Sequence, residues 1–167
     1  TRTDAQFVAI GFGLVASPIE EDREEMISQA RALGLDSAAH ALINRMSPVT
    51  SRLVLSGFSR GYDELGKIRK ELAQHPWSQQ IHGEYSGDIV RLTDDELRRL
   101  GRARFDNLEL IWDYDSVAAL QRVNVPVLWV LAPEDREAPI ETTRAALLKL
   151  KKAGKPIDIY VFPDTDH

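Results

Sequence analysis

The fold is decided by residues Val125–Phe162, which read VPVLWVLAPEDREAPIETTRAALLKLKKAGKPIDIYVF. Two apolar runs in this stretch, Val125–Ala132 and Ile157–Phe162, have the length and the β-branched content of buried strands. Between them, Ile140–Ala153 carries apolar residues toward one side and Arg and Lys toward the other, as an amphipathic helix does, and Gly154 is a helix stop signal. The pattern predicts a strand–helix–strand unit with parallel strands.

A third strand is expected near the amino end, at Gln6–Phe12 (QFVAIGF). This run and the Val125 run are almost continuously apolar and show no polar alternation. Such runs are typical of parallel sheets in which helices cover both faces. We therefore expect an α/β fold with a parallel sheet flanked by helices.

The segment between the first two strands has the pattern of helices. Ser17-Pro18-Ile19-Glu20 is a capping box that opens a charged helix running to Gly34. A second helix begins at Asp36 or Ser37, and Pro48 is expected to interrupt it. Further helices are expected over residues 50–73 and 93–102, and a short one capped by Asp115 or Ser116 runs through Leu120. The predicted organisation is a core strand in residues 1–16, a helical insertion in 17–116 and the remaining core in 117–167.

The composition narrows the classes of function. Hydrophobic residues make up 43% of the 167 residues, charged residues 28%, and the net charge is −5. No long basic cluster and no long apolar run occur, so we predict neither nucleic-acid nor membrane binding. The chain has no cysteine, which excludes disulfides and thiolate chemistry but leaves both the cytoplasm and an exported location open.

Two residues at the ends of predicted strands are the candidate catalytic groups. In an open parallel sheet, functional residues collect just beyond the carboxyl ends of the strands. Asp135 follows the second strand and His167 follows the third. If they touch, Asp135 accepts the Nδ1 proton of His167, whose Nε2 then acts as a general base. The other histidines lack metal-ligand spacing, and we predict no metal and no cofactor.

Residues 114–167 resemble the last third of the α/β hydrolases. The matching residues are Pro126, Val127, Leu128, Asp135, Pro139, Phe162, Pro163 and His167. The resemblance implies an α/β-hydrolase fold with an inserted helical cap, and a serine carboxylesterase or peptidase that acts on a small-molecule ester or a peptide. It also implies that Asp135, rather than its neighbour Glu134, is the acid of a Ser-His-Asp triad.

The nucleophile is harder to place. Gly57-Phe58-Ser59-Arg60-Gly61 has the form of a nucleophile elbow, and the order of Ser59, Asp135 and His167 fits the fold. An elbow needs a buried strand before it, however, and Leu53–Leu55 is short. The resemblance places Ser59 in the cap and the nucleophile upstream of Thr1. This sequence would then be one incomplete hydrolase domain, inactive alone, that pairs with the amino-terminal half of the fold.

Other functions stay open at this point. One is a complete short hydrolase that uses Ser59. Another is a non-catalytic α/β binding module that pairs with a partner through its sheet edge, or with a second copy of itself through exposed apolar surface. A nucleotide-binding fold is a weaker alternative, because Gly11-Phe12-Gly13 lacks the third glycine of the phosphate-binding turn. Ser17 is explained by its position in the capping box.

Overall fold

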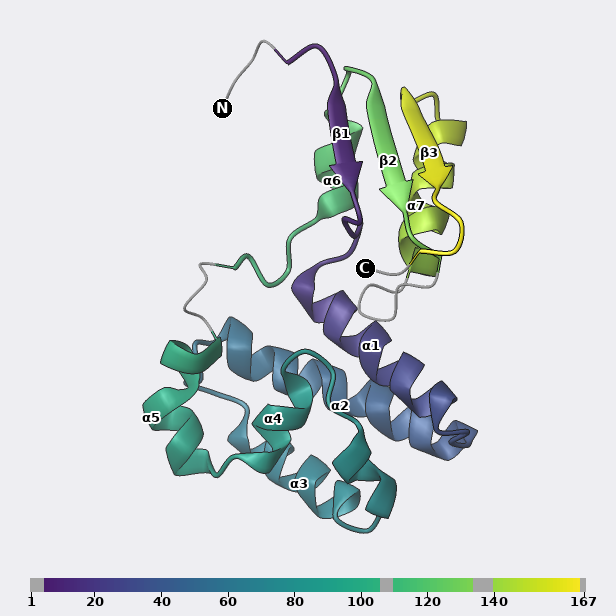
Figure 1. Ribbon diagram of the computed structural model, residues 1–167. Coiled ribbons are helices and arrows are strands. Elements are labelled where there is room, and N and C mark those ends of the chain that lie inside the picture. Colours follow the sequence, from purple (N-terminus) through teal and green to yellow (C-terminus); the bar gives the residue numbers. More distant parts are fainter. Residues whose placement is uncertain (1–4, 106–109, 134–139, 166–167) are drawn as a thin grey trace. The chain divides into compact units, whose positions relative to one another are not determined.

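The computed structural model describes residues 5–105, 110–133 and 140–165 and has a mixed α/β fold (Figure 1). The chain divides into two compact units: the sheet unit, Thr1–Ser17 with Tyr114–His167, and the helical unit, Pro18–Asp113. The elements in chain order are β1 (Val8–Gly11), α1 (Pro18–Ala32), α2 (Ser37–Leu55), α3 (Tyr62–Leu72), η1 (Pro76–Gln80), α4 (Ser86–Arg91), α5 (Asp94–Phe105), α6 (Ser116–Gln121), β2 (Val127–Leu131), α7 (Ile140–Lys152) and β3 (Ile157–Val161).

The sheet unit contains a three-stranded parallel sheet in the order β1-β2-β3. Val8 pairs with Val127, which in turn pairs with Ile157. The predicted strand–helix–strand unit is confirmed, since α7 connects the neighbouring strands β2 and β3. Gly154, at φ +88°, ends α7 as predicted, with the Lys155 amide donating to the Leu150 carbonyl at 3.1 Å.

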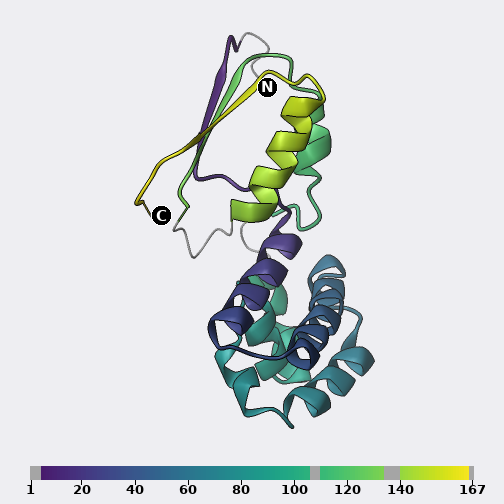
Figure 2. The same cartoon turned by 90° about the vertical axis from the view of Figure 1, so that its right-hand side faces the viewer.

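Helices α6 and α7 of this unit cover one face of the sheet (Figure 2). That face contributes Val127, Trp129, Leu131 and Ile157 to a core with Leu147 of α7. The opposite face carries side chains that remain exposed, notably Leu128 at 43% and Tyr160 at 51%. The predicted parallel sheet with flanking helices is confirmed. Among the described residues of this unit the helices cover one face, so the strands alternate between covered and exposed residues, although nearly all are apolar.

The helical unit holds two apolar cores, and α2 contributes to both. Ile43 and Met46 lie in one core, and Leu53 and Val54 lie in the other. The expectation that Pro48 interrupts this helix was wrong, because α2 continues from Ser37 to Leu55. The burial of apolar residues on both sides of the proline outweighs the hydrogen bond that proline cannot make. Asp36 caps the helix, its Oδ1 accepting from the Ala39 amide at 2.9 Å.

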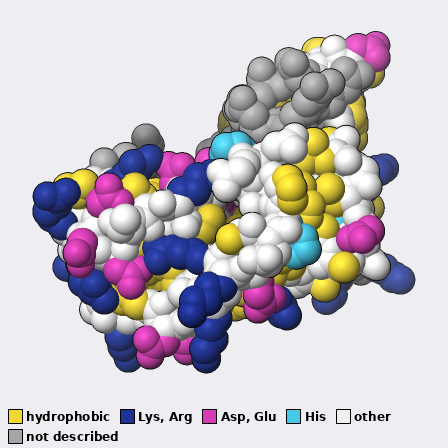
Figure 3. All heavy atoms as spheres, turned by 90° about the horizontal axis from the view of Figure 1, so that it is seen from below, with side chains coloured by type: hydrophobic (Ala, Val, Ile, Leu, Met, Phe, Trp, Pro, Cys, Tyr) yellow, Lys and Arg dark blue, Asp and Glu magenta, His cyan; other side chains and the backbone are white. Residues whose placement is uncertain are grey.

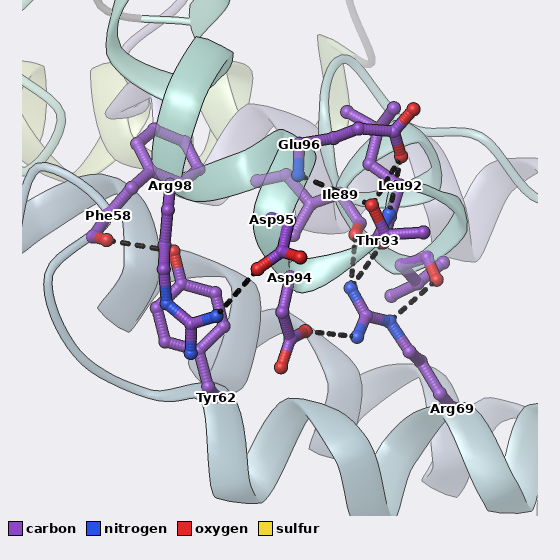
Figure 4. A network of polar contacts seen from close by, with 11 residues as sticks. Phe58, Tyr62, Arg69, Ile89, Leu92, Thr93, Asp94, Asp95, Glu96 and Arg98 are labelled. Atoms are coloured by element: carbon purple, nitrogen blue, oxygen red, sulfur yellow. Dashed lines mark hydrogen bonds and ion pairs between the residues drawn. The ribbon is translucent and has the colours of Figure 1, made fainter.

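A single arginine fixes the connection between α4 and α5 (Figure 4). From α3, Arg69 donates to the Val90 carbonyl at 3.0 Å, to the Leu92 carbonyl and to Asp94 Oδ1 at 2.5 Å. Thr93 and Glu96 form a capping box at the start of α5. Backbone carbonyls at the end of a short helix thereby obtain the donors that they lack.

Candidate active site

The carboxyl edge of the sheet is where the sequence predicts chemistry, and its strands end level with one another. The Phe12 amide donates to the Val130 carbonyl at 3.0 Å, and the Phe162 amide donates to the Leu131 carbonyl at 2.8 Å. Strand pairing therefore persists to the last residue of each strand. The chain leaves β1, β2 and β3 at the same edge, as the parallel order requires.

The segment that follows β1 is anchored beside this edge. The Val15 amide donates to Oγ1 of the fully buried Thr143, in the first turns of α7, at 2.9 Å. Nε1 of Trp129 donates to the Gly13 carbonyl at 2.9 Å, so the central strand holds the same segment from a second side. These two bonds fix the loop after β1 against the start of α7, within one unit.

The two predicted catalytic residues follow β2 and β3 in the sequence. Asp135 is the fourth residue after Leu131, and His167 is the sixth after Val161. Both lie outside the described residues. Before His167, the chain makes a turn in which Asp164 has φ +52° and Thr165 Oγ1 donates to the Pro163 carbonyl at 3.0 Å.

The described geometry limits how far apart the two loops begin. β2 and β3 are hydrogen-bonded neighbours, and neighbouring strands lie about 4.8 Å apart. Segments that leave neighbouring parallel strands at the same end therefore begin close together. A carboxylate paired with an imidazole would be an oriented general base and would still need a nucleophile and oxyanion donors.

Ser59 does not have the surroundings of a nucleophile. Leu53–Leu55 is the last turn of α2, so a helix rather than a strand precedes the motif. Gly57 and Phe58 have φ of +59° and +60°, and Ser59 Oγ donates to the Ser56 carbonyl at 2.8 Å. The motif is the helix C-terminus and turn between α2 and α3, which is the structural role that the sequence favoured.

The other singled-out polar residues have structural surroundings. Ser17 is buried immediately before α1, whose first residue is Pro18. The ring of His75 stacks on Trp77, and Nδ1 of His82 lies 3.1 Å from an Arg91 guanidinium nitrogen. Within the described ranges, no group of three His, Cys, Asp or Glu side chains could hold a metal ion.

A buried polar network in the helical unit was not predicted from the sequence. Asp22 of α1 is fully buried, and its Oδ1 accepts from the amides of Tyr85 and Ser86 at 2.8 and 3.0 Å. Its Oδ2 accepts from Ser86 Oγ at 2.5 Å, and Ser86 Oγ lies 2.6 Å from Thr50 Oγ1. Burial raises the pKa of Asp22, although these hydrogen bonds act in the opposite direction. The network joins α1, α2 and α4.

One turn further along α1, Glu25 has a perturbed acidity. Burial, followed by the nearby Glu84 carboxylate, raises the pKa of Glu25 to about 7. Its Oε1 accepts from Gln29 Nε2 at 2.8 Å, whereas its buried Oε2 has no hydrogen-bond partner among the described residues. The folded unit therefore holds the proton of Glu25 to higher pH than an unfolded chain would.

Charge on the surface is mixed. On the face shown in Figure 3, Lys and Arg side chains alternate with Asp and Glu side chains and with apolar surface. No described helix has the length and apolar content needed to cross a membrane.

Comparison with known proteins does not assign the chain. It matches no known protein family, no curated protein and no solved structure.

Proposed function

We propose that this chain supplies the acid and the base of a serine hydrolase that cleaves ester or peptide bonds. One observation carries the proposal: β2 and β3 are neighbouring parallel strands joined through α7. Asp135 and His167 follow the carboxyl ends of these two strands. Ligands and reactive groups of open α/β sheets collect at that edge.

The roles of the two residues follow from their chemistry. The Asp135 carboxylate accepts the Nδ1 proton of His167, holds the ring in one tautomer and stabilises the imidazolium when it forms. Nε2 of His167 takes the proton of a serine hydroxyl as that oxygen attacks the carbonyl carbon. The same proton then passes to the leaving oxygen or nitrogen, and water repeats the sequence on the acyl-enzyme.

The proposed nucleophile is a serine upstream of Thr1, in an amino-terminal half of the hydrolase fold. The helical surroundings of Ser59 support this choice over a complete short hydrolase. We further propose that the helical unit, Pro18–Asp113, is a cap inserted between β1 and the remaining core and that it shapes the substrate site.

The experiment is labelling with a fluorophosphonate probe that reacts with activated serines. The probe is applied to this chain and to the longest natural protein that contains it, and the modified peptide is mapped by mass spectrometry. We expect no labelling of the chain alone and labelling of one upstream serine in the longer protein, lost on His167→Ala. Labelling of Ser59, or labelling of the longer protein that survives His167→Ala, would contradict the proposal.

A second candidate is a non-catalytic partner module. The exposed side chains of the uncovered sheet face, Leu128, Tyr160 and Phe162, favour it, because apolar sheet faces of this kind are usually covered. The same probe separates the two functions. A partner module would show no serine labelling in any protein that contains the chain.

A further inference from the structure

An open pocket in the helical unit suggests a binding site that is independent of the proposed catalytic residues. It lies along α1, α2 and the turn after α2 and has a volume of about 690 Å³. Small-molecule sites usually measure roughly 300–1,000 Å³ and combine apolar walls with a few polar groups. The pocket therefore has the size of a ligand site.

The walls of the pocket combine apolar side chains with cations. Ile19, Pro48 and Leu55 supply apolar surface, and three arginines also line the pocket: Arg23, Arg52 and Arg60. Glu20 is the one carboxylate among the lining residues. The lining thus carries a net positive charge in a protein whose net charge is −5.

Pro48 lies in the wall of the pocket, within α2. Because proline has no backbone N–H, the Asn44 carbonyl lacks its helical donor, and the proline ring crowds that turn. The hydroxyls of Thr50 and Ser51 donate to carbonyls of the preceding turn, including that of Ser47.

Arg23 lies 3.8 Å from the Glu24 carboxylate, whereas Arg52 and Arg60 are available to a ligand. Arg60 forms no ion pair with any residue that the structure describes. Arg52 lies 2.9 Å from Glu64, but both side chains are about half exposed, so this pair contributes little and can rearrange. The turn that carries Arg60 is held by Ser56, whose Oγ accepts from the Arg60 amide at 3.2 Å and donates to the Leu53 carbonyl at 3.0 Å.

We propose that this pocket binds a small amphipathic anion, with its apolar body against Ile19, Pro48 and Leu55 and its carboxylate or phosphate near Arg52 and Arg60. Guanidinium groups bind both kinds of headgroup through paired hydrogen bonds. The inference uses only residues of the helical unit and does not rest on the proposed hydrolase activity.

The test titrates the isotopically labelled full chain with octanoate, octyl phosphate and the uncharged octanamide. Chemical shifts of the backbone amides, measured by NMR, report binding. We expect at least one anion to bind at least about threefold more tightly than octanamide, since a partly exposed ionic contact contributes roughly 1 kcal/mol. Its amide shifts should map to residues around Pro48 and Arg60. The anion that binds more tightly identifies the headgroup.

Matched variants distinguish the pocket from non-specific association. Arg60→Gln and Arg52→Gln should each weaken anion binding by at least about threefold. Arg45→Gln should leave anion binding unchanged. Arg45 is an exposed arginine of α2 outside the pocket lining, and it pairs with Glu71 of α3. Leu55→Ser should weaken all three ligands, because Leu55 supplies apolar surface. Equal binding of octanamide and the anions, no effect of the Arg variants, or no saturable binding would overturn the proposal.

Discussion

The sheet unit and the helical unit use polar residues in different ways. The sheet unit has one apolar core, built from the covered face of the strands with α6 and α7, and its candidate catalytic residues follow the strands on loops. The helical unit has two apolar cores and a buried carboxylate, Asp22, that accepts three hydrogen bonds. Buried, satisfied polar groups fix a structure, whereas polar groups that follow strand ends in the sequence are the ones that we propose for chemistry.

The largest effect expected from this contrast is on turnover by the longest natural protein that contains the chain. His167→Ala removes the proposed base and, if the proposal holds, should lower kcat by roughly 10⁶-fold, the loss known for removal of the base from a well-studied serine protease. His75→Ala, at an exposed position of the helical unit, should leave kcat unchanged. Hydrolysis of p-nitrophenyl esters and peptide p-nitroanilides measures both. If His167→Ala and His75→Ala lower kcat equally, the proposed catalytic role is not specific to His167 of the sheet unit.

The acid should have the next largest effect. Asp135→Asn keeps the size of the side chain but favours the wrong tautomer of His167, so kcat should fall about 10⁴-fold. Glu134→Gln is the matched control, and its rate should stay close to that of the unmodified protein. The same substrates report the outcome. A large loss in Glu134→Gln with none in Asp135→Asn would assign the acid to the neighbouring residue.

In the helical unit, replacing the buried carboxylate of Asp22 should affect stability. Asp22→Ala leaves the amides of Tyr85 and Ser86 and the Ser86 hydroxyl without their acceptor, which should lower the free energy of unfolding of this unit by about 3 kcal/mol. Hydrogen exchange of α1, α2 and α4 measures the loss. Asp63→Ala, at an exposed site on α3, should change little. Faster exchange confined to the sheet unit would contradict the assignment of Asp22.

The smallest expected effect is a pH dependence of the helical unit. Because burial and Glu84 raise the pKa of Glu25 from 4.5 to about 7, folding favours its protonated form. This contribution to stability is complete below the unfolded pKa and is lost as the pH rises through about 7. Hydrogen exchange corrected for its intrinsic rate should show a more stable unit at about pH 5.5 than at about pH 8, and Glu25→Gln should reduce the difference. If the stability difference between the two pH values persists in Glu25→Gln, or has the opposite sign, the pH dependence belongs to other groups.

The sequence predicted those elements that carry local signals. β2, α7 and β3 were found because apolar periodicity and the Gly154 stop signal agree, and Asp115 caps α6 as predicted, accepting from the Ala118 amide at 2.8 Å. Pro48 misled the prediction, because the two cores on either side of it are assembled from residues distant in sequence. The uncovered sheet face was also missed, since Leu128 and Val130 are as apolar as covered residues would be.

The candidate sites also differ in whether a local sequence signal points to them. The segments after β2 and β3 could be singled out because a position after a strand is visible in the sequence, whereas the choice of Asp135 over Glu134 rested on the resemblance to the α/β hydrolases. Asp22 could not be singled out, because it lies in the acidic run Glu20–Glu25 and its partner Tyr85 is 63 residues away. The pocket near Pro48 is likewise assembled by packing of α1 against α2, and its arginines resemble ordinary surface residues in the sequence.

The most direct test of the central claim is whether Asp135 and His167 meet at the edge of the sheet. The chain has no cysteine, so Asp135→Cys with His167→Cys introduces the one thiol pair. A short bis-maleimide, which adds to two thiols, then reports their proximity through the mass of the cross-linked product. We predict efficient intramolecular cross-linking of this pair and little for Asp158→Cys with His167→Cys, because Asp158 is near the amino end of β3. Equal cross-linking of the two pairs, or none at positions 135 and 167, would contradict the account.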